Sequence, residues 1–177
     1  MKHVFLVTGP PGIGKTTLLL ETVNLLKKRG FKVGGMLSHE VRENGNRIGF
    51  EIVDLGSEKR GCLAHVNQQT GPQVGKYRVN MKDLENIGAE AIAAAVSKCE
   101  IVAIDEIGPM ELFSQKFRSA VKNALQSSRT TIAVVHWKAK DRLIDYARGM
   151  ESAEIFIVTS ENRDKLGQQL AAKACNE

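Results

Sequence analysis

The feature that most constrains the fold of this chain is the stretch GPPGIGKTT, which begins at Gly9. It follows a short apolar run at residues 3–8 (HVFLVT) and precedes a leucine-rich segment at 15–29 that ends in three cations and Gly30. A continuous apolar run is typical of a buried parallel strand, whereas helically spaced leucines before a basic last turn and a glycine are typical of a helix. The sequence therefore predicts a tight loop between a buried strand and a helix.

The remainder of the chain continues to alternate between strand-like and helix-like segments. Further strands are expected at about 36–43, 47–54, 77–80, 100–108, 130–136 and 154–159. Further helices are expected at 82–98, 111–127, 140–149 and 160–174, the last with Ser160 as its N-cap. This alternation predicts an α/β fold, a three-layer α/β/α sandwich around a mostly parallel sheet.

One region departs from the alternation, at about 36–80. Asn44-Gly45 is a strong hairpin signal between two loosely alternating segments, and the chain from Gly56 to Lys76 is rich in loop residues. We expect an antiparallel hairpin that extends the sheet, followed by one or two further short strands. Because no linker or repeat divides the sequence, residues 1–177 are predicted to form a single domain.

Composition limits the classes of function. The 177 residues are 42% hydrophobic and 25% charged, with a net charge of +5 and three widely spaced cysteines. These values suit a globular protein in a reducing compartment, and no apolar run is long enough to span a membrane. We expect a cytoplasmic monomer. Nucleic-acid binding is not indicated, since no basic run exceeds three residues.

Residues Gly9–Thr16, here called the glycine loop, fit the pattern G-x-x-x-x-G-K-[ST], the P-loop. Glycines let backbone amides turn toward phosphate oxygens, the helix N-terminus favours anions, and Lys15 reaches the β- and γ-phosphates. Lys15 is therefore also a candidate catalytic residue. The candidate nucleotide-binding residues here are Gly9, Pro10, Pro11, Gly12, Ile13, Gly14, Lys15, Thr16 and Thr17.

A P-loop requires an acidic partner at the end of a neighbouring strand, and IVAID ends in Asp105. We expect Thr16 and Asp105 to hold Mg²⁺. Glu106 follows directly and is the candidate base that activates the attacking water, with Glu111 as its nearest rival. Glu111 has an alternative role, as an anchor for the helix that follows it.

The stretches GPPGIGKTT, EVRENGNRIGFEIVDL, IDEIGPMELFS and VTSENRD resemble, in this order, the small P-loop nucleoside-triphosphatase family. That family includes the cancer-related nucleoside triphosphatase and its thermophile relatives, and the resemblance spans residues 3 to 170. It implies a P-loop NTPase fold and slow, Mg²⁺-dependent hydrolysis of several nucleoside triphosphates. It also implies that the nucleotide site continues from Asp105 and Glu106 through Ile107 and Gly108.

The chain departs from the family pattern at two places. Pro109 stands where several relatives have lysine, and VVHWKAKD, with His136 and Trp137, replaces a Thr-Ile-Pro segment. Trp137 is either a surface for a nucleotide base or a partly buried anchor. Asn162 and Arg163 follow the end of a predicted parallel strand, where α/β sheets bind ligands, and are therefore candidate nucleotide-binding residues.

Two further cations, Arg42 and Arg47, flank the predicted hairpin turn and are either phosphate ligands or solvated hairpin residues. No Asn-Lys-x-Asp element that would select guanine is present, which fits broad base specificity. The leading hypothesis is a nucleoside triphosphatase. The alternatives are a P-loop kinase that phosphorylates a small acceptor and an ATPase switch stimulated by a partner or a nucleic acid.

Overall fold

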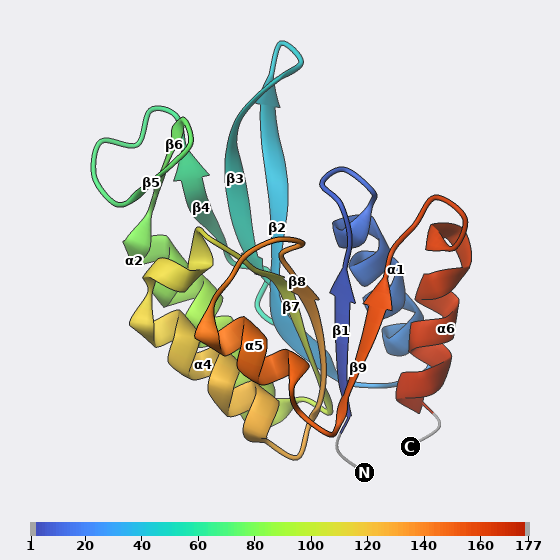
Figure 1. The fold of residues 1–177 in the computed structure, drawn as a ribbon. Helices are drawn as coiled ribbons and strands as arrows, with labels where there is room; N and C mark the ends of the chain where they lie inside the picture. Colours follow the sequence, from blue (N-terminus) through green and yellow to red (C-terminus); the bar gives the residue numbers. More distant parts are fainter. Residues whose placement is uncertain (1–2, 176–177) are drawn as a thin grey trace.

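The computed structural model describes residues 3–175, which form a nine-stranded sheet between two layers of helices (Figure 1). The strand order is β5-β6-β4-β3-β2-β7-β8-β1-β9. The strands are β1 (Val4–Thr8), β2 (Val33–Glu43), β3 (Asn46–Asp54), β4 (Arg60–His65), β5 (Gln73–Val74), β6 (Tyr77–Val79), β7 (Ile101–Ile107), β8 (Thr130–Val135) and β9 (Ala153–Ile157). The predicted α/β fold is confirmed.

The helices cover both faces of the parallel part of the sheet. α1 (Lys15–Lys28) packs with α6 (Arg163–Cys175) on one face, and the other helices lie on the opposite face (Figure 1). These are α2 (Met81–Asp83), the π-helix η1 (Leu84–Ala89), α3 (Glu90–Lys98), the 3₁₀-helix η2 (Glu111–Phe113), α4 (Gln115–Gln126) and α5 (Arg142–Arg148). None of the helices described is long and apolar enough to cross a membrane.

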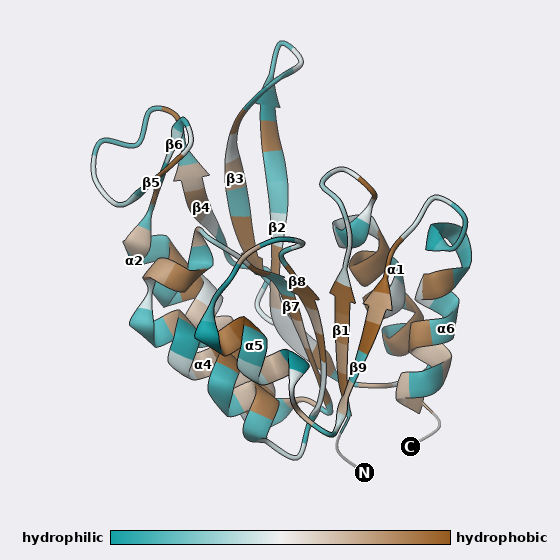
Figure 2. Cartoon of the chain, in the orientation of Figure 1, coloured by the Kyte–Doolittle hydropathy of each residue, from teal (hydrophilic) through white to brown (hydrophobic). Residues whose placement is uncertain are grey.

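Alternation along the central strands divides the core into two clusters. In β1, Val4 and Leu6 belong to the cluster under α3 and α4, while Phe5 and Val7 belong to the cluster under α1 and α6. Both faces of the strand are apolar because successive side chains point to opposite sides and helices cover both. Figure 2 shows the resulting hydrophobic colour of β1.

The parallel strands determine where the functional residues meet. β8 pairs in parallel with both β1 and β7, so it lies between the strand before the glycine loop and the strand that ends near Asp105. β2 and β9 continue the parallel sheet on either side. The carboxyl ends of these strands share one edge of the sheet, where ligands of open α/β sheets bind.

The antiparallel extension is larger than a hairpin. β2 and β3 meet at a turn in which Asn44 (φ 48°) and Gly45 (φ 79°) are both left-handed, as a two-residue hairpin loop requires. β4, β6 and β5 then continue the same sheet by antiparallel pairing. The segment at 56–80, expected to hold one or two short strands besides 77–80, supplies β4 and β5 as well as β6.

Two predicted helix starts are wrong. The helix expected from residue 111 begins at Gln115, because Ser114 accepts a hydrogen bond from the Phe117 amide and caps it. Ser160 does not cap the last helix, which begins at Arg163 after a turn at 160–162. Both Ser114 and Ser160 have a hydroxyl that could cap a helix, but only Ser114 stands directly before one; a turn separates Ser160 from α6.

Gly35 allows β2 to approach β7. Its φ of +120° is a conformation that side chains rarely adopt, and a Cβ there would lie 1.9 Å from the carbonyl oxygen of Ala103. Gly30, after α1, also has a positive φ (+91°), but a Cβ there would meet nothing within 4 Å. A side chain at Gly30 would therefore meet only backbone strain, whereas one at Gly35 would meet both backbone strain and a steric clash.

Gly35→Ala is expected to lower the free energy of unfolding by about 3 kcal/mol or more, since it adds overpacking against backbone to the strain of a left-handed residue. Gly30→Ala is expected to lower it by only about 1 kcal/mol. Urea unfolding of both variants would measure the difference. Equal losses would show that the contact with Ala103 relaxes freely.

Candidate active site

A cleft of about 590 Å³ opens at the carboxyl edge of the parallel strands. The glycine loop forms one side, the ends of β7 and β8 form the floor, and the β2–β3 hairpin with β4 and β5 forms the other side. The lining residues that sequence reasoning had singled out are Pro11, Gly12, Gly14, Lys15, Thr16, Thr17, Arg47, Asp105, Glu106, Pro109, Glu111, His136 and Trp137. The structure therefore brings most of the predicted site into one cavity.

The glycine loop joins β1 to α1 through two left-handed glycines. Gly12 has a φ of +76° and Gly14, at the start of α1, a φ of +106°; a Cβ on either would meet nothing within 4 Å. Backbone conformation, not space, is what requires glycine at these positions. No side chain caps the start of α1, and its first turn holds no acidic residue, so an anion can approach its amides.

Lys15 lies folded over the loop that precedes it. Its Nζ donates hydrogen bonds to the carbonyl oxygens of Gly9 (2.8 Å) and Pro10 (3.0 Å). Burial lowers the pKa of Lys15, and the nearby carboxylates of Glu106 and Asp105 oppose that shift. The ammonium group is therefore held among carbonyl oxygens and acids at the mouth of the loop, where a phosphate would provide stronger partners.

Asp105 is nearly inaccessible, at 2% exposure, and its Oδ2 has no hydrogen-bond partner among the described residues. Burial raises the pKa of Asp105 to about 7, and Glu106 adds to the shift; the Thr16 side chain and the Ser38 backbone favour the ionised form. A buried carboxylate oxygen without a partner, close to a threonine hydroxyl, suits a cation.

Within residues 3–175 no three His, Cys, Asp or Glu side chains are grouped so as to hold a metal by themselves. Magnesium in nucleotide sites needs no such group, because one or two carboxylates, water and substrate phosphates complete its shell. Thr16 and Asp105 fit this donor set. The structure thus agrees with a Mg²⁺ that binds together with a phosphate ligand.

Three carboxylates meet at the end of β7. Gly108 separates the side chains of Glu106 and Glu111: a Cβ on Gly108 would lie 2.6 Å from Glu106 Oε1 and 3.2 Å from Glu111 Oε2. Burial raises the pKa of Glu106, opposed by His136 and Lys15, and raises the pKa of Glu111 well above its usual value. Glu111 also accepts hydrogen bonds from its own and the Gly108 backbone, so it anchors this turn as well as lining the cleft.

His136 is the residue that sequence reasoning underrated. It follows β8 directly, between the ends of β1 and β7, and lies close enough to lower the pKa of Glu106. Its Nδ1 accepts hydrogen bonds from the amides of Lys138 (3.3 Å) and Ala139 (3.0 Å). The ring nitrogen that remains to donate a hydrogen bond is therefore Nε2. A polar residue directly after a buried strand, the same signal that singled out Asp105, would have identified it.

Other predicted residues lie beside the cleft. Asn162 does not line it; its side chain closes the turn after β9 by bonding the amide of Thr159 and the carbonyl of Ile157, both at 2.8 Å. Arg163 is exposed and also outside the lining. Val158, just before this turn, packs against Gly9. The turn thus adjoins the glycine loop, and nucleotide binding by Asn162 and Arg163 stays a prediction.

Ile107 and Gly108 support the site from below. The Ile107 side chain is fully buried in the core, and its carbonyl accepts a hydrogen bond from the His136 amide (3.1 Å). Gly108 keeps room for the two glutamates. Any contact of these two residues with a nucleotide stays a prediction.

The fold and the cavity define a class: an α/β protein whose glycine-rich loop, at the end of a central parallel strand, faces acidic residues across a ligand-sized cleft. The sequence model of the family described as NTPase matches residues 4–171. The chain therefore belongs to the NTPase family. This confirms the resemblance seen in the sequence, and with it the expected enzyme class, the nucleoside-triphosphate phosphatases.

Individual relatives agree over almost the whole chain. The chain is 48% identical over 170 residues to nucleoside-triphosphatase THEP1 of Thermofilum pendens, covering 94% of this chain and 92% of the relative. It is 46% identical to the THEP1 of Methanosarcina acetivorans over 165 residues, covering 93% and 92% of the two chains.

Two solved structures share the fold. The crystal structure of THEP1 from the hyperthermophile Aquifex aeolicus matches with a TM-score of 0.87 at 29% identity, covering 97% of this chain and 99% of the other. The solution structure of a human cancer-related nucleoside triphosphatase matches with a TM-score of 0.83 at 34% identity, covering 100% and 99%.

Burial of Asp105 predicts a stability that depends on pH. Because its pKa is raised to about 7 in the fold, the folded state binds more protons than the unfolded chain between about pH 4 and 7. Stability is therefore greater at acidic pH and falls as the pH rises to 7. In EDTA at pH 8, Asp105→Asn is expected to melt about 5 °C above the wild type, and at pH 5 close to it.

Thermal melts at both pH values would measure this effect, with the exposed Asp145→Asn as a matched control that leaves the wild-type pattern. Mg²⁺ with a nucleotide should stabilise the wild type but not Asp105→Asn. A variant that is less stable than the wild type at pH 8 would contradict the assignment of Asp105 as a costly buried charge.

Proposed function

We propose that the protein is a Mg²⁺-dependent nucleoside triphosphatase that hydrolyses ATP, GTP, CTP, UTP and similar triphosphates to diphosphates, slowly and with broad base specificity. One observation carries the proposal: Lys15, Thr16, Asp105 and Glu106 line a single cleft at the carboxyl edge of the parallel strands. The names of the relatives support the same activity.

The glycine loop would bind the phosphates. Backbone amides of the loop and the N-terminus of α1 donate to the phosphate oxygens, and Lys15 exchanges the carbonyls of Gly9 and Pro10 for the β- and γ-phosphates. An anion is a better partner for an ammonium group than a neutral carbonyl. Binding thus replaces weak bonds of the empty loop with stronger ones.

Thr16 and Asp105 would hold Mg²⁺. The ion supplies positive charge that neutralises the phosphate oxygens and orients the γ-phosphate. A cation held near Asp105, whose Oδ2 has no hydrogen-bond partner among the described residues, would offset the cost of burying the charge of this carboxylate.

Glu106 would activate water. The water oxygen forms a bond to the γ-phosphorus as its proton passes to the Glu106 carboxylate, and the bond from the γ-phosphorus to the β–γ bridging oxygen breaks to release the diphosphate. A raised pKa makes this carboxylate a better proton acceptor near neutral pH. The Nε2–H of His136, close to Glu106, would donate to the γ-phosphate or to the carboxylate and hold the reacting groups in place.

The slow turnover in this proposal is supported by the arginine content of the cleft. Among the residues that line the cleft, Arg47 is the one arginine, and it is bonded to Tyr77 and Glu40. Without an arginine on the γ-phosphate, turnover of about 10⁻² per second or less is expected by analogy with unassisted P-loop enzymes. We also propose a monomer that acts on free nucleotides in the cytoplasm.

Glu106→Gln is expected to keep binding Mg-ATP and to lose hydrolysis by at least about 10²-fold, because a carboxamide cannot accept the proton of water. Phosphate release from ATP, GTP, CTP and UTP, measured without any acceptor, tests the activity and its breadth together. Release from several triphosphates by the wild type is the expected result.

Glu111→Gln is the matched control, because it changes a neighbouring buried carboxyl in the same way. If Glu111→Gln loses hydrolysis and Glu106→Gln does not, the base is Glu111. If the wild type releases no phosphate although Mg-ATP binds, hydrolysis is not the activity of this site.

His136→Ala is expected to lower kcat by about 10²-fold with the affinity for Mg-ATP little changed, since one preorganised donor is lost. His136→Gln should recover part of the rate, because its amide can donate near the position of Nε2. Steady-state kinetics of both variants would test this. A kcat within twofold of the wild type for His136→Ala would remove His136 from the mechanism.

A further inference from the structure

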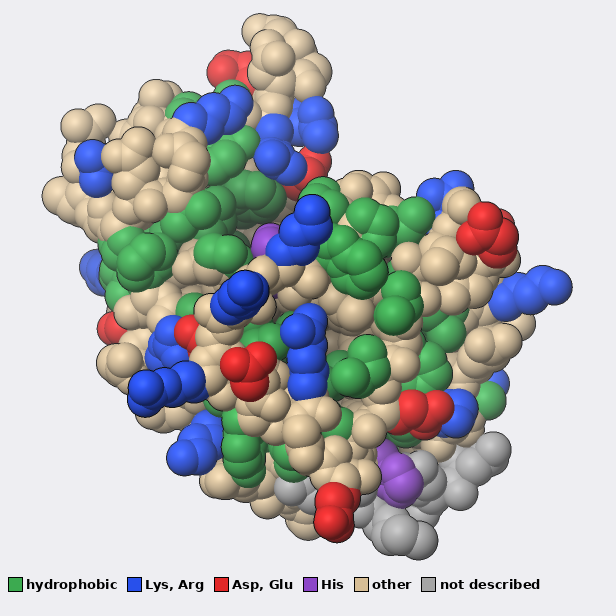
Figure 3. Space-filling view, viewed as in Figure 1, with side chains coloured by type: hydrophobic (Ala, Val, Ile, Leu, Met, Phe, Trp, Pro, Cys, Tyr) green, Lys and Arg blue, Asp and Glu red, His purple; other side chains and the backbone are tan. Residues whose placement is uncertain are grey.

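The cleft extends well beyond the glycine loop. Its outer part, here called the outer chamber, lies under the β2–β3 hairpin, where Figure 3 shows a hollow with hydrophobic side chains on its wall and basic ones near its rim. The outer chamber is lined by Arg47, Phe50, Leu63, Val74, Met110 and Trp137. Hydrolysis requires only water beside the γ-phosphate, so it does not explain an apolar wall in this part of the cleft.

The outer chamber adjoins the place of the γ-phosphate. β2 pairs with β7 through Met36 and Ile104, passes Asp105 at Ser38 and then leads outward along the cleft to Glu40. The γ-phosphate lies at the Lys15 and Asp105 end of a bound triphosphate, while the other phosphates follow the loop toward α1. A triphosphate bound in this way would direct its base away from the outer chamber and leave it open.

The wall of the outer chamber is aromatic. The rings of Phe50 and Tyr77 meet edge to face with centroids 5.2 Å apart. The guanidinium carbon of Arg47 lies 5.1 Å from the centre of the Phe50 ring and 5.8 Å from that of Tyr77. Trp137 and the thioether of Met110 also line the cavity. Such surfaces stack well on flat heteroaromatic rings.

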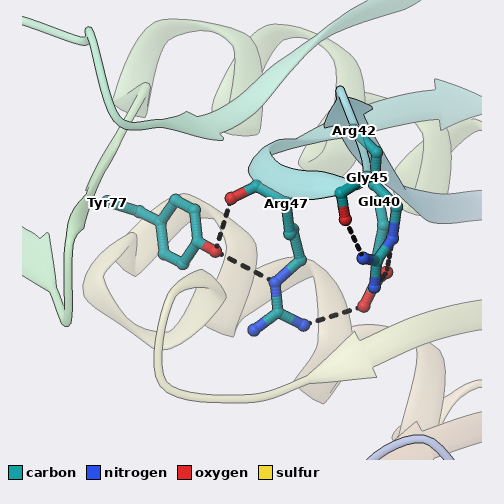
Figure 4. Close-up of polar contacts among 5 residues, drawn as sticks. All are labelled: Glu40, Arg42, Gly45, Arg47 and Tyr77. Atoms are coloured by element: carbon teal, nitrogen blue, oxygen red, sulfur yellow. Dashed lines mark hydrogen bonds and ion pairs between the residues drawn. The ribbon is translucent and has the colours of Figure 1, made fainter.

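Arg47 is held in position at the edge of this wall (Figure 4). Its Nε donates to the Tyr77 hydroxyl (2.9 Å), and its Nη1 donates to Glu40 Oε1 (2.8 Å). The remaining nitrogen, Nη2, donates to none of the described residues (Figure 4). A fixed guanidinium with donor capacity left over favours an anionic group.

Arg42 provides the contrast within the same hairpin. It also bonds to Glu40 (2.7 Å) and to the Gly45 carbonyl (2.9 Å), yet it is not part of the cleft lining. A role in stiffening the hairpin would apply to both arginines, but only Arg47 lies beside the aromatic side chains of the cavity. The position of Arg47 over Phe50 is what links it to the cavity.

We propose that the outer chamber is a second ligand site, which takes a small molecule with a heteroaromatic ring and an anionic group, the chemistry of a nucleoside monophosphate. The ring packs against Phe50, Met110 and Trp137, and the anion binds Arg47. The site rests on the proposed function in one respect: a triphosphate with Mg²⁺ fills the glycine loop while the second ligand binds.

The test uses the fluorescence of Trp137, the single tryptophan of the chain. The protein is first saturated with Mg²⁺ and a non-hydrolysable ATP analogue, whose binding is measured on its own. AMP, adenosine and ribose 5-phosphate are then titrated separately. AMP should change the fluorescence saturably, and each half-molecule should bind at least about tenfold more weakly, since each makes only one set of contacts.

Variants assign the binding to the outer chamber. Arg47→Ala and Phe50→Ala should each weaken AMP at least about tenfold. Arg42→Ala and the exposed Phe113→Ala remove the same residue types outside the lining and should leave AMP binding unchanged. Far-ultraviolet circular dichroism and melting curves check that all four variants fold.

Three results would overturn the second site: no saturable change with AMP, equal AMP affinity in the wild type and the Arg47 and Phe50 variants, or displacement of the ATP analogue by AMP. The last would place AMP in the glycine loop. Failure of the analogue to bind in the first step would count against the proposed function instead, so the two failures are distinguishable.

Discussion

The parallel pairing of β8 with both β1 and β7 is the constraint on which the site depends. Three strand ends thereby lie side by side, and each contributes a different group: the glycine loop, a histidine, and a pair of acids. The pairing is stabilised by core side chains on both faces, because helices cover the sheet on each side. The site needs no loop longer than a few residues to bring these groups together.

Local pattern was enough to predict part of this arrangement. The glycine loop, the strand ending in Asp105 and the left-handed Asn44-Gly45 turn are each specified by neighbours in the sequence, and the structure places them as expected. The order of the strands was not predictable, since the pairing of β8 with β1 joins segments more than a hundred residues apart. The place of His136 directly after a buried strand could be read from the sequence, but its position beside the acids of β7 depends on this pairing.

Other features could not be predicted from the sequence because they depend on contacts between segments that are distant in the chain. The outer chamber combines β3, β4, β5 and the ends of β7 and β8, and no sequence spacing relates them. Ser114 and Ser160 have equal capping chemistry, yet only Ser114 starts a helix, where its hydroxyl also donates to Glu85 (2.9 Å). The nucleotide contacts of Asn162 and Arg163 and the single-domain boundary at 1–177 stay predictions from sequence.

β2 pairs with different strands along its length. Its first residues pair with β7 in the covered core, Met36 pairs with both β7 and β3, and its last residues, exposed in the hairpin, pair with β3 alone. Local opening free energy should therefore decline from Met36 toward Asn44 along one continuous strand. Opening of the hairpin tip is therefore expected to leave the residues beside Asp105 in place.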